Sequence, residues 1–391
     1  MNLKSAIFTF RLLSPDEKQT IKETSNYISK KNLKQLKILL KRKLCKININ
    51  PMPYSKTITS IENYPVCTSN DPKYNEKITE INNEIKDTLD SKIQEEFKNN
   101  AFEKTTSLLA PKIIGFDTIK KVTALQLFSK DPYHILLLGD PGTGKTDILR
   151  AAEILSPISA FGLGSGTSNT GLTITVSGKE VKKGILSLAD GGLALIDELN
   201  LMKQEDRAGL YNAMEKGFVT YDKGGHHYKF PANCSLLASA NPKKDKIIGH
   251  DIFGIKKQIP LDIALLSRFH MVFLIRKQNL NEFMNIADEV LTEKHKSITK
   301  KDTEFMKKYI EYAKKINIIF PEQYNDQIMD FVQTVKLKES KLLFDITPRF
   351  VIGIKRLIES SARLELRTKV EKKDVDRIIN LYLQTLKNLG L

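Results

Sequence analysis

The amino-acid sequence predicts an α/β fold in which helices flank a parallel β-sheet. Short apolar runs, typical of buried strands, occur at residues 135–138, 193–196, 235–239 and 271–275. The stretches between them have helical character, and this alternation favours parallel strands. From about residue 280 onward the apolar spacing is helical only, so a helical region should follow the sheet.

The region before the sheet is strongly basic, in a chain of 391 residues whose net charge is +16. No acidic residue lies between Glu23 and Glu62, and the basic residues there include Lys30, Lys31, Lys34, Lys37, Lys41, Arg42, Lys43 and Lys46. Leucines recur among them at helical spacing, which predicts a basic amphipathic helix. A positive excess favours an acidic polymer as partner, with nucleic acid first. A merely solvated helix face is the alternative interpretation.

A second apolar stripe follows a proline- and asparagine-rich stretch at residues 50–72. Its members are Ile78, Ile81, Ile85, Leu89, Ile93 and Phe97. Their spacing predicts one long helix whose apolar face serves packing or self-association. We therefore divide the chain into a basic, mainly helical region (1–105), an α/β core (106–278) and a helical domain (279–391).

The first apolar run of the sheet ends in a phosphate-binding loop. Residues 139–146 fill every fixed position of the pattern G-x-x-x-x-G-K-[ST] between a strand and a helix. Lys145 would reach the β- and γ-phosphates of ATP, and the Thr146 hydroxyl would hold Mg²⁺. The predicted nucleotide-binding residues are Gly139, Asp140, Pro141, Gly142, Thr143, Gly144, Lys145 and Thr146.

Polar side chains end the next two apolar runs. Asp197 and Glu198 follow residues 193–196, at the strand end where ligands bind in open α/β sheets. Asp197 can complete the Mg²⁺ shell, and Glu198 can polarise the water that attacks the γ-phosphate. Asn241 follows the third run, where its amide could orient that water; by itself an Asn-Pro pair is an ordinary turn.

Two arginines are candidates for stabilising the transition state. Phosphoryl transfer gains from positive charge, often supplied by an arginine of a neighbouring subunit. Arg268 should open the strand at 271–275, and Arg349 follows Thr347-Pro348 at a predicted helix start. Either arginine, taken singly, is more often a surface residue.

Together these motifs resemble the minichromosome maintenance (MCM) family, hexameric AAA+ ATPases that move along DNA as replicative helicases. The similarity runs from about Leu108 to Leu386. Residues 110–115 resemble the segment beside the adenine, which adds Ile114 to the nucleotide site. Residues 189–207 resemble the Walker B strand and its following helix, 238–242 the sensor 1 strand, 264–269 the arginine-finger segment and 347–349 sensor 2.

The resemblance implies roles for these residues and a ring of subunits. It makes Asn241 a sensor in its own subunit, whereas Arg268 and Arg349 would act on the neighbour's nucleotide. It also implies a homo-oligomer, with six subunits in the family, and DNA of either strandedness bound without sequence preference.

Two segments would face the DNA. Residues 218–230 read as a β-hairpin whose turn is Asp222, Lys223, Gly224 and Gly225. They resemble the family's pre-sensor 1 hairpin, where Lys223 takes the place of the lysine that touches the DNA backbone. Lys179 and Lys182 lie in an insert between Leu172 and Gly184 that is shorter than the family's helix-2 insert.

Other features of the family are missing from the sequence. The region before Leu108 has neither the zinc pattern nor an OB-fold pattern, and we expect no C-terminal winged helix after the helical domain. Three widely spaced cysteines exclude a disulfide framework and a Cys-x-x-Cys site, so we expect no zinc. With no run of 18 apolar residues and no signal peptide, we expect a cytoplasmic, nucleoid-associated protein without a membrane partner.

The sequence thus predicts an AAA+ P-loop NTPase core with an α-helical lid and a small, mainly helical N-terminal region. The predicted function is that of a shortened MCM-like motor, a ring-forming DNA helicase or translocase driven by ATP and Mg²⁺. An AAA+ remodeller of a protein partner and a helicase-inactive MCM homologue are the alternatives.

Overall fold

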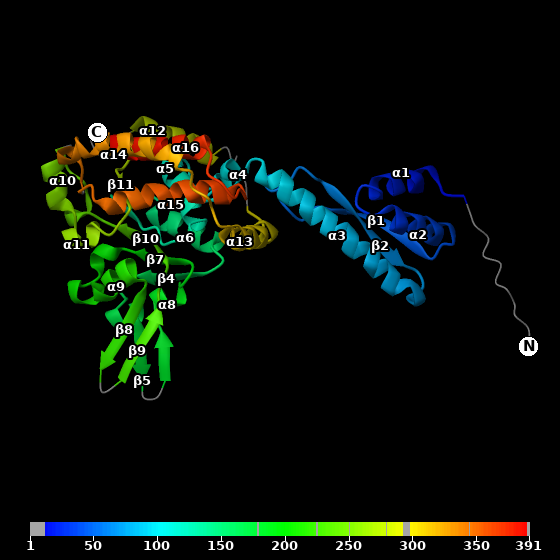
Figure 1. The fold of residues 1–391 in the computed structure, drawn as a ribbon, viewed down its shortest axis with the longest axis horizontal. Helices are drawn as coiled ribbons and strands as arrows, with labels where there is room; N and C mark the ends of the chain where they lie inside the picture. The colour runs from blue at the N-terminus through cyan, green and yellow to red at the C-terminus, as the bar shows by residue number, and fades with distance from the viewer. Residues whose placement is uncertain are drawn as a thin grey trace, which may run out of the picture. The chain divides into compact units, whose positions relative to one another are not determined.

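The structure is a computed structural model of the whole chain, and two compact units make it up. The first unit spans Met1–Asn100 and the second Ala101–Leu391 (Figure 1). The described residues are 12–177, 180–223, 226–249, 251–278, 280–291, 298–343 and 345–388.

The described part of the first unit packs three α-helices and two strands around a small core. Its elements are α1 (Pro15–Thr24), α2 (Lys30–Lys41), β1 (Cys45–Pro51), β2 (Asn63–Ser69) and α3 (Asn75–Lys98). Ser14 and Ser29 begin the first two helices, because each hydroxyl accepts a hydrogen bond from a first-turn N–H group. The predicted basic helix is α2, and the predicted apolar stripe is the buried face of α3.

The strand pair of this unit was not predicted. β1 and β2 run antiparallel, with Cys45 opposite Ser69 and Pro51 opposite Asn63. Cys45 and Cys67 point into the core while their neighbours are more exposed. An alternation of this kind is easily overlooked in a stretch rich in asparagine and proline, residues that are depleted from strands.

The second unit is built on a five-stranded parallel sheet in the order β11-β3-β10-β7-β4. Its strands are β3 (Ile135–Gly139), β4 (Ser159–Leu163), β7 (Leu193–Asp197), β10 (Ser235–Ala240) and β11 (Met271–Ile275). Four of them are the predicted strands, and three of these are buried along their whole length. β4 was missed because it is an edge strand, and most of its residues are only partly buried.

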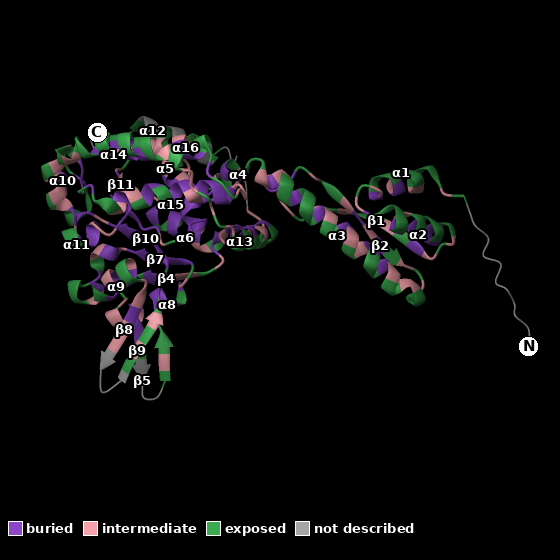
Figure 2. Ribbon diagram, in the orientation of Figure 1, coloured by how far each residue is buried: buried purple, intermediate pink, exposed green. Residues whose placement is uncertain are grey.

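Helices cover both faces of this sheet, and further helices form a lid beside it (Figure 1). Figure 2 shows the buried residues gathered on the strands and on the inward sides of these helices. Around the sheet lie α4 (Ala101–Leu108), α5 (Asp117–Leu127), α6 (Lys145–Leu155), α7 (Asn169–Leu172), α8 (Ile185–Leu188), α9 (Ala208–Lys216), α10 (Ile252–Gln258) and α11 (Ile263–Leu266). The lid helices are α12 (Leu280–Leu291), α13 (Lys300–Lys314), α14 (Asn325–Lys336), α15 (Pro348–Leu364) and α16 (Lys372–Asn388). The α/β class, the AAA+ core and the helical lid are confirmed.

Two β-hairpins lie side by side and project from the body of the second unit (Figure 1). One joins β5 (Ile174–Ser177) to β6 (Glu180–Lys183), and the other joins β8 (Phe218–Lys223) to β9 (His226–Pro231). The predicted turn of the second hairpin was too long, since Asp222 and Lys223 belong to β8 and pair with His227 and His226. Two residues between the strands suffice for a hairpin.

Three arginines at seven-residue intervals fasten α15 to the sheet domain. Arg349 donates to the carbonyl oxygen of Ser267, Arg356 to that of Pro132, and Arg363 to that of Phe128. Each of these carbonyl groups lies in a connection between structural elements. The lid helix therefore holds a fixed position on the core.

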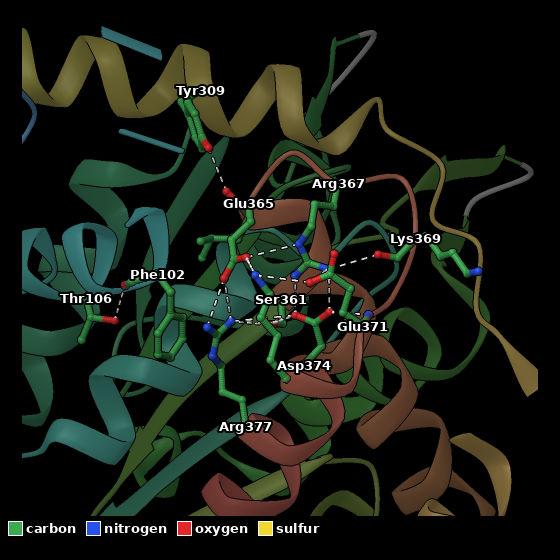
Figure 3. A network of polar contacts seen from close by, with 12 residues as sticks. Phe102, Thr106, Tyr309, Ser361, Glu365, Arg367, Lys369, Glu371, Asp374 and Arg377 are labelled. Atoms are coloured by element: carbon green, nitrogen blue, oxygen red, sulfur yellow. Dashed lines mark hydrogen bonds and ion pairs between the residues drawn. The ribbon is translucent and has the colours of Figure 1, made fainter. Parts of the chain in front are cut away.

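A second polar network joins α15 to α16, as Figure 3 shows. The buried carboxylate of Asp374 accepts hydrogen bonds from both terminal nitrogens of Arg367, at 2.8 and 2.6 Å, and one from Ser361. Arg377 donates to Glu365 and lies 4.2 Å from the ring centre of Phe102 on α4. Because every charged member has a partner, the network fixes the end of the lid without leaving a buried charge unpaired.

Candidate nucleotide site at the carboxyl edge of the sheet

Three adjacent strands bring the predicted catalytic groups to one edge of the sheet. The phosphate-binding loop follows β3, Asn241 follows β10, and Asp197 ends β7. Since β10 lies between the other two, Asn241 stands between the loop and the acidic pair. This carboxyl edge is where ligands bind in open parallel sheets.

The backbone of the loop has the form that a phosphate cradle needs. Gly142 and Gly144 have φ angles of +74° and +84°, in the left-handed region that disfavours other residues. A Cβ atom built on Gly142 would meet no atom within 4 Å, so the space above the loop is open to a ligand. The loop thus fits a nucleotide phosphate.

Lys145 begins α6 and turns its ammonium group back onto the loop. Its Nζ donates to the carbonyl oxygens of Gly139 and Asp140, at 2.9 and 2.6 Å. Burial lowers the pKa of this lysine, and Asp140, Asp197 and Glu198 oppose the shift. The site therefore holds a positive charge among carbonyl oxygens beside the place that phosphates would take.

The side chain of Asp140 holds the phosphate-binding loop against two neighbouring segments. One carboxylate oxygen accepts the N–H group of Ile247 at 2.8 Å, and the other accepts that of Lys277 at 3.1 Å. The buried carboxylate thus ties the loop to the segments that follow β10 and β11. Because the carboxylate is occupied in this way, Asp140 would bind the nucleotide through its backbone, and this contact stays a prediction.

The acidic pair is held by a serine of the central strand. Ser239 on β10 donates to the Asp197 carboxylate, and its hydroxyl also accepts the N–H group of Glu198 at 3.0 Å. Glu198 has a φ angle of 52°, an uncommon conformation for a residue with a side chain. Asp197 is buried and Thr146 is exposed, a donor set that suits Mg²⁺ because this ion uses few protein ligands besides phosphates and water.

The segment predicted to flank the adenine lies against the same loop. Ile113 and Phe116 each place a carbon 3.9 Å from the position of a Cβ on Gly144. Lys120 on α5 fixes the segment by donating to the carbonyl oxygen of Ile113. Ile114 lies between them in the chain and is partly buried, so its adenine contact stays a prediction.

The two candidate arginines lie together at the opposite edge of the sheet. Arg268 precedes the amino end of β11, whereas the phosphate-binding loop follows the carboxyl end of β3, which pairs with β11 residue by residue. Five residues of strand, about 16 Å, separate these edges. Arg349 donates to the carbonyl oxygen of Ser267 and therefore lies at the same edge as Arg268. At this distance neither arginine can reach a nucleotide on the phosphate-binding loop of its own chain.

Arg268 is held in this position by its own chain. It donates to Glu215 at 2.7 Å and to the carbonyl oxygen of Ala264 at 2.6 Å, and its guanidinium carbon lies 4.9 Å from the ring centre of Tyr211. The bond from Arg268 lowers the pKa of Glu215. The Arg268 Nε atom is buried and has no hydrogen-bond partner among the described residues.

Comparison with known protein families decides what this arrangement belongs to. A family model described as the MCM P-loop domain matches residues 90–294, more than half of the chain, and one described as the MCM AAA-lid domain matches residues 304–386. The chain belongs to the MCM family. The resemblance seen in the sequence is confirmed.

Individual MCM proteins are similar over most of this chain. The minichromosome maintenance protein MCM of Saccharolobus solfataricus is 30% identical over 312 residues, which are 74% of this chain and 45% of that protein. The DNA replication licensing factor mcm7 of Xenopus tropicalis is 30% identical over 308 residues, 72% of this chain and 42% of that protein. The chain thus spans less than half the length of these MCM relatives.

Both hairpins fall within the matched MCM P-loop domain. Lys223 ends β8 and pairs with His226 instead of lying in the turn, and its side chain and all of Lys179 lie outside the described residues. Lys182 is exposed on β6 and lies 3.4 Å from Glu180. The DNA contacts of these three lysines stay predictions.

Three residues of the MCM site were not found from the sequence. They are Ser239, Glu215 and Asn200, whose side-chain oxygen accepts the N–H group of Asn241 at 2.9 Å. Ser239 could have been found, because a serine in a wholly buried strand needs a hydrogen-bond partner.

In the described residues we find no helix with the length and apolarity that a bilayer crossing requires.

Proposed function

We propose that this MCM protein is an ATP-hydrolysing motor that works as a ring on DNA, as a helicase or translocase. The observation that carries the proposal is the separation of the two halves of the site. Lys145, Asp197 and Asn241 lie at the carboxyl edge of the sheet, and Arg268 and Arg349 lie at the amino edge. A second copy of the chain would bring its Arg268 and Arg349 to the nucleotide bound at the carboxyl edge of the first, and the complete site would then lie between two subunits.

The residues at the carboxyl edge divide the work of hydrolysis. Lys145 would leave its carbonyl oxygens for the β- and γ-phosphates of ATP, and Thr146 and Asp197 would hold Mg²⁺, which neutralises phosphate charge. Glu198 would polarise the attacking water, and Asn241 would orient it. Ser239 keeps the acidic pair in place by binding both the Asp197 carboxylate and the Glu198 backbone.

The neighbouring copy would supply the positive charge. Arg268 has an unpartnered Nε donor in the described part of the chain, and Arg349 stands beside it on the rigid α15. Closed rings form when such a head-to-tail contact repeats around an axis. Six copies follow from the family resemblance.

The projecting hairpins would carry the output to DNA. Lys223 at one tip, with Lys179 and Lys182 on the neighbouring hairpin, would contact the phosphate backbone, which gives affinity without sequence preference. Relatives named DNA replication licensing factors support DNA as the polymer.

The test is the ATPase rate of the full chain, measured alone and with single-stranded or duplex DNA. We expect DNA to stimulate hydrolysis, and Lys223→Ala to lose the stimulation while keeping the rate without DNA. Lys145→Ala, inactive in every condition, controls for contaminating ATPases. Hydrolysis that ignores DNA would favour a remodeller of a protein partner, and no hydrolysis at all would favour an inactive homologue.

A further inference from the structure

A stripe of four lysines runs along the exposed face of α2 in the first unit. Lys30, Lys34, Lys37 and Lys41 are spaced by four, three and four residues, which places them on one side of the helix. All four are exposed. At 1.5 Å per residue the stripe is about 16 Å long.

The stripe cannot rotate away from solvent, because the opposite face of α2 is buried. Leu36, Leu39 and Leu40 belong to the core of this unit. Glu84 on α3 fixes the start of the helix, since its carboxylate accepts the Ser29 N–H group at 2.8 Å and the Asn32 side-chain amide at 2.6 Å. The four ammonium groups are therefore presented together in a fixed orientation.

These four lysines have no counter-charge within the described residues. No ion pair reaches any of them there: of the α3 acids beside α2, Glu80 pairs with Lys77 at 2.5 Å, and Glu84 accepts hydrogen bonds from Ser29 and Asn32. The first turn of α2 itself carries no acid, and the Glu84 carboxylate at its start bonds to Ser29 and Asn32, not to a lysine of the stripe. Within the described residues, the four ammonium groups are therefore available to a partner outside this unit.

The neighbouring cleft does not supply that partner. A cavity of about 600 Å³ lies between α1 and β1, and its walls carry Lys43 and Lys46 as well as Asp16 and Glu17. With both signs of charge, the cavity has no preference for an anion. The stripe, by contrast, has one sign and lies on an open helix face.

We infer that the α2 lysine stripe binds the phosphodiester backbone of DNA as a second contact, separate from the hairpins of the motor. A linear polyanion matches a row of like charges and releases counterions on binding. A membrane surface does not fit. A helix at a membrane interface inserts its apolar face into the lipid, whereas the apolar face of α2 is buried in the core of this unit. The choice of DNA rests on the proposed function.

The experiment compares full-length wild type with the variant Lys34→Gln/Lys37→Gln/Lys41→Gln, without nucleotide, at several KCl concentrations. A labelled mixed-sequence oligonucleotide, single-stranded or duplex, is the probe, and its fluorescence anisotropy gives Kd. Each lost phosphate contact flattens the dependence of log K on log salt by about 0.9, so we expect a slope reduced by up to about 3 and binding at least about tenfold weaker at low salt.

Two matched variants control for charge and for folding. Lys338→Gln/Lys341→Gln/Lys372→Gln removes the same charge from exposed lid lysines and should keep the wild-type slope. Lys34→Arg/Lys37→Arg/Lys41→Arg keeps the charge and should keep the binding. Because Lys, Arg and Gln have similar helix propensity, circular dichroism should be the same for all four proteins.

Other outcomes would overturn the inference. If log K depends on log salt as steeply in the glutamine variant as in wild type, the stripe does not bind DNA. This holds even if DNA still stimulates ATP hydrolysis and the proposed motor function is supported. An unchanged slope with a smaller particle by light scattering would assign the stripe to a second copy of the chain. A third result would separate the two proposals. If the glutamine variant has the reduced salt dependence but the wild-type protein hydrolyses no ATP, DNA binding by the lysine stripe is supported and the proposed motor function is contradicted.

Discussion

The two edges of the parallel sheet hold their charged groups in different ways. At the carboxyl edge Lys145 is bound by two carbonyl oxygens, neutral acceptors that a phosphate can replace. At the amino edge Arg268 is bound by the carboxylate of Glu215 and by a carbonyl oxygen. One edge is ready for a ligand as it stands, and the other must exchange a charged partner before it can act.

This difference suggests that the assembly of copies, rather than nucleotide binding alone, completes the site. A nucleotide can enter the carboxyl edge of a single chain. The amino edge gains only if a neighbour's nucleotide offers more negative charge than the exposed Glu215 does. The contrast between the two edges can be tested by substitutions, of which those in the shared site should have the largest effect.

Mixing two inactive variants should restore activity if the arginine works on the neighbour. Arg268→Ala should lower kcat for ATP about 10³-fold, since a transition-state arginine contributes that much or more. Lys145→Ala should be inactive as well. In an equal mixture of the two, about a quarter of the head-to-tail contacts would join an intact loop to an intact arginine. The measurement is the steady-state ATPase rate of the mixture.

The outcome separates the two arrangements cleanly. Recovery toward a quarter of the wild-type rate supports a site shared between copies. A mixture as inactive as its components would contradict it, provided that gel filtration finds both variants in mixed assemblies. Lys338→Ala, which changes an exposed lysine of the lid, serves as the control that mixing itself changes nothing.

The amino edge should also make the fold sensitive to acid. Burial lowers the pKa of His134 to about 3, and burial together with His134 holds the pKa of His270 well below its usual range. Each Nδ1 accepts a backbone N–H group, from Leu236 and from His134 respectively, which a proton on that atom would forbid.

The sign follows from proton binding. Between pH 6.5 and about 3 the unfolded chain protonates His134 while the folded chain does not, so stability is present above pH 6.5 and falls on acidification. The slope approaches about 1.4 kcal/mol per pH unit for each such histidine. Thermal unfolding at several pH values should show His134→Gln with a weaker pH dependence than wild type, and the exposed His227→Gln with the wild-type dependence.

Ser239 tests how firmly the carboxyl edge is held. Ser239→Ala removes the donor to Asp197 and the acceptor for the Glu198 N–H group, so we expect a loss of about 1 to 3 kcal/mol in unfolding free energy. The kcat for ATP should fall about tenfold through misplacement of the acidic pair, with a smaller change in KM. Ser239→Thr, which keeps the hydroxyl, should recover most of the rate; failure to do so would make the role of Ser239 one of packing only.

How far the sequence predicts the molecule depends on whether a feature is local. The phosphate-binding loop and the pair Asp197-Glu198 are readable because their chemistry sits in consecutive residues at a strand end. Ser239 and Glu215 act across 42 and 53 residues of sequence, so their roles appear only once strand order is known. β4 and the β1–β2 pair escaped because half-buried strands have weak apolar patterns.

The smallest effect is expected at Glu215, and it bears directly on the contrast between the edges. The Glu215 side chain is 50% exposed, so its ion pair with Arg268 contributes little to stability. If Arg268 must leave Glu215 to reach a neighbour's nucleotide, Glu215→Gln lowers the barrier to that exchange and should raise kcat by a few fold. A fall in kcat approaching that of Arg268→Ala would instead mean that Glu215 aims the arginine in the working state. Glu205→Gln, an exposed acid that lies 4.0 Å from a lysine rather than beside Arg268, provides the matched control and should leave kcat unchanged.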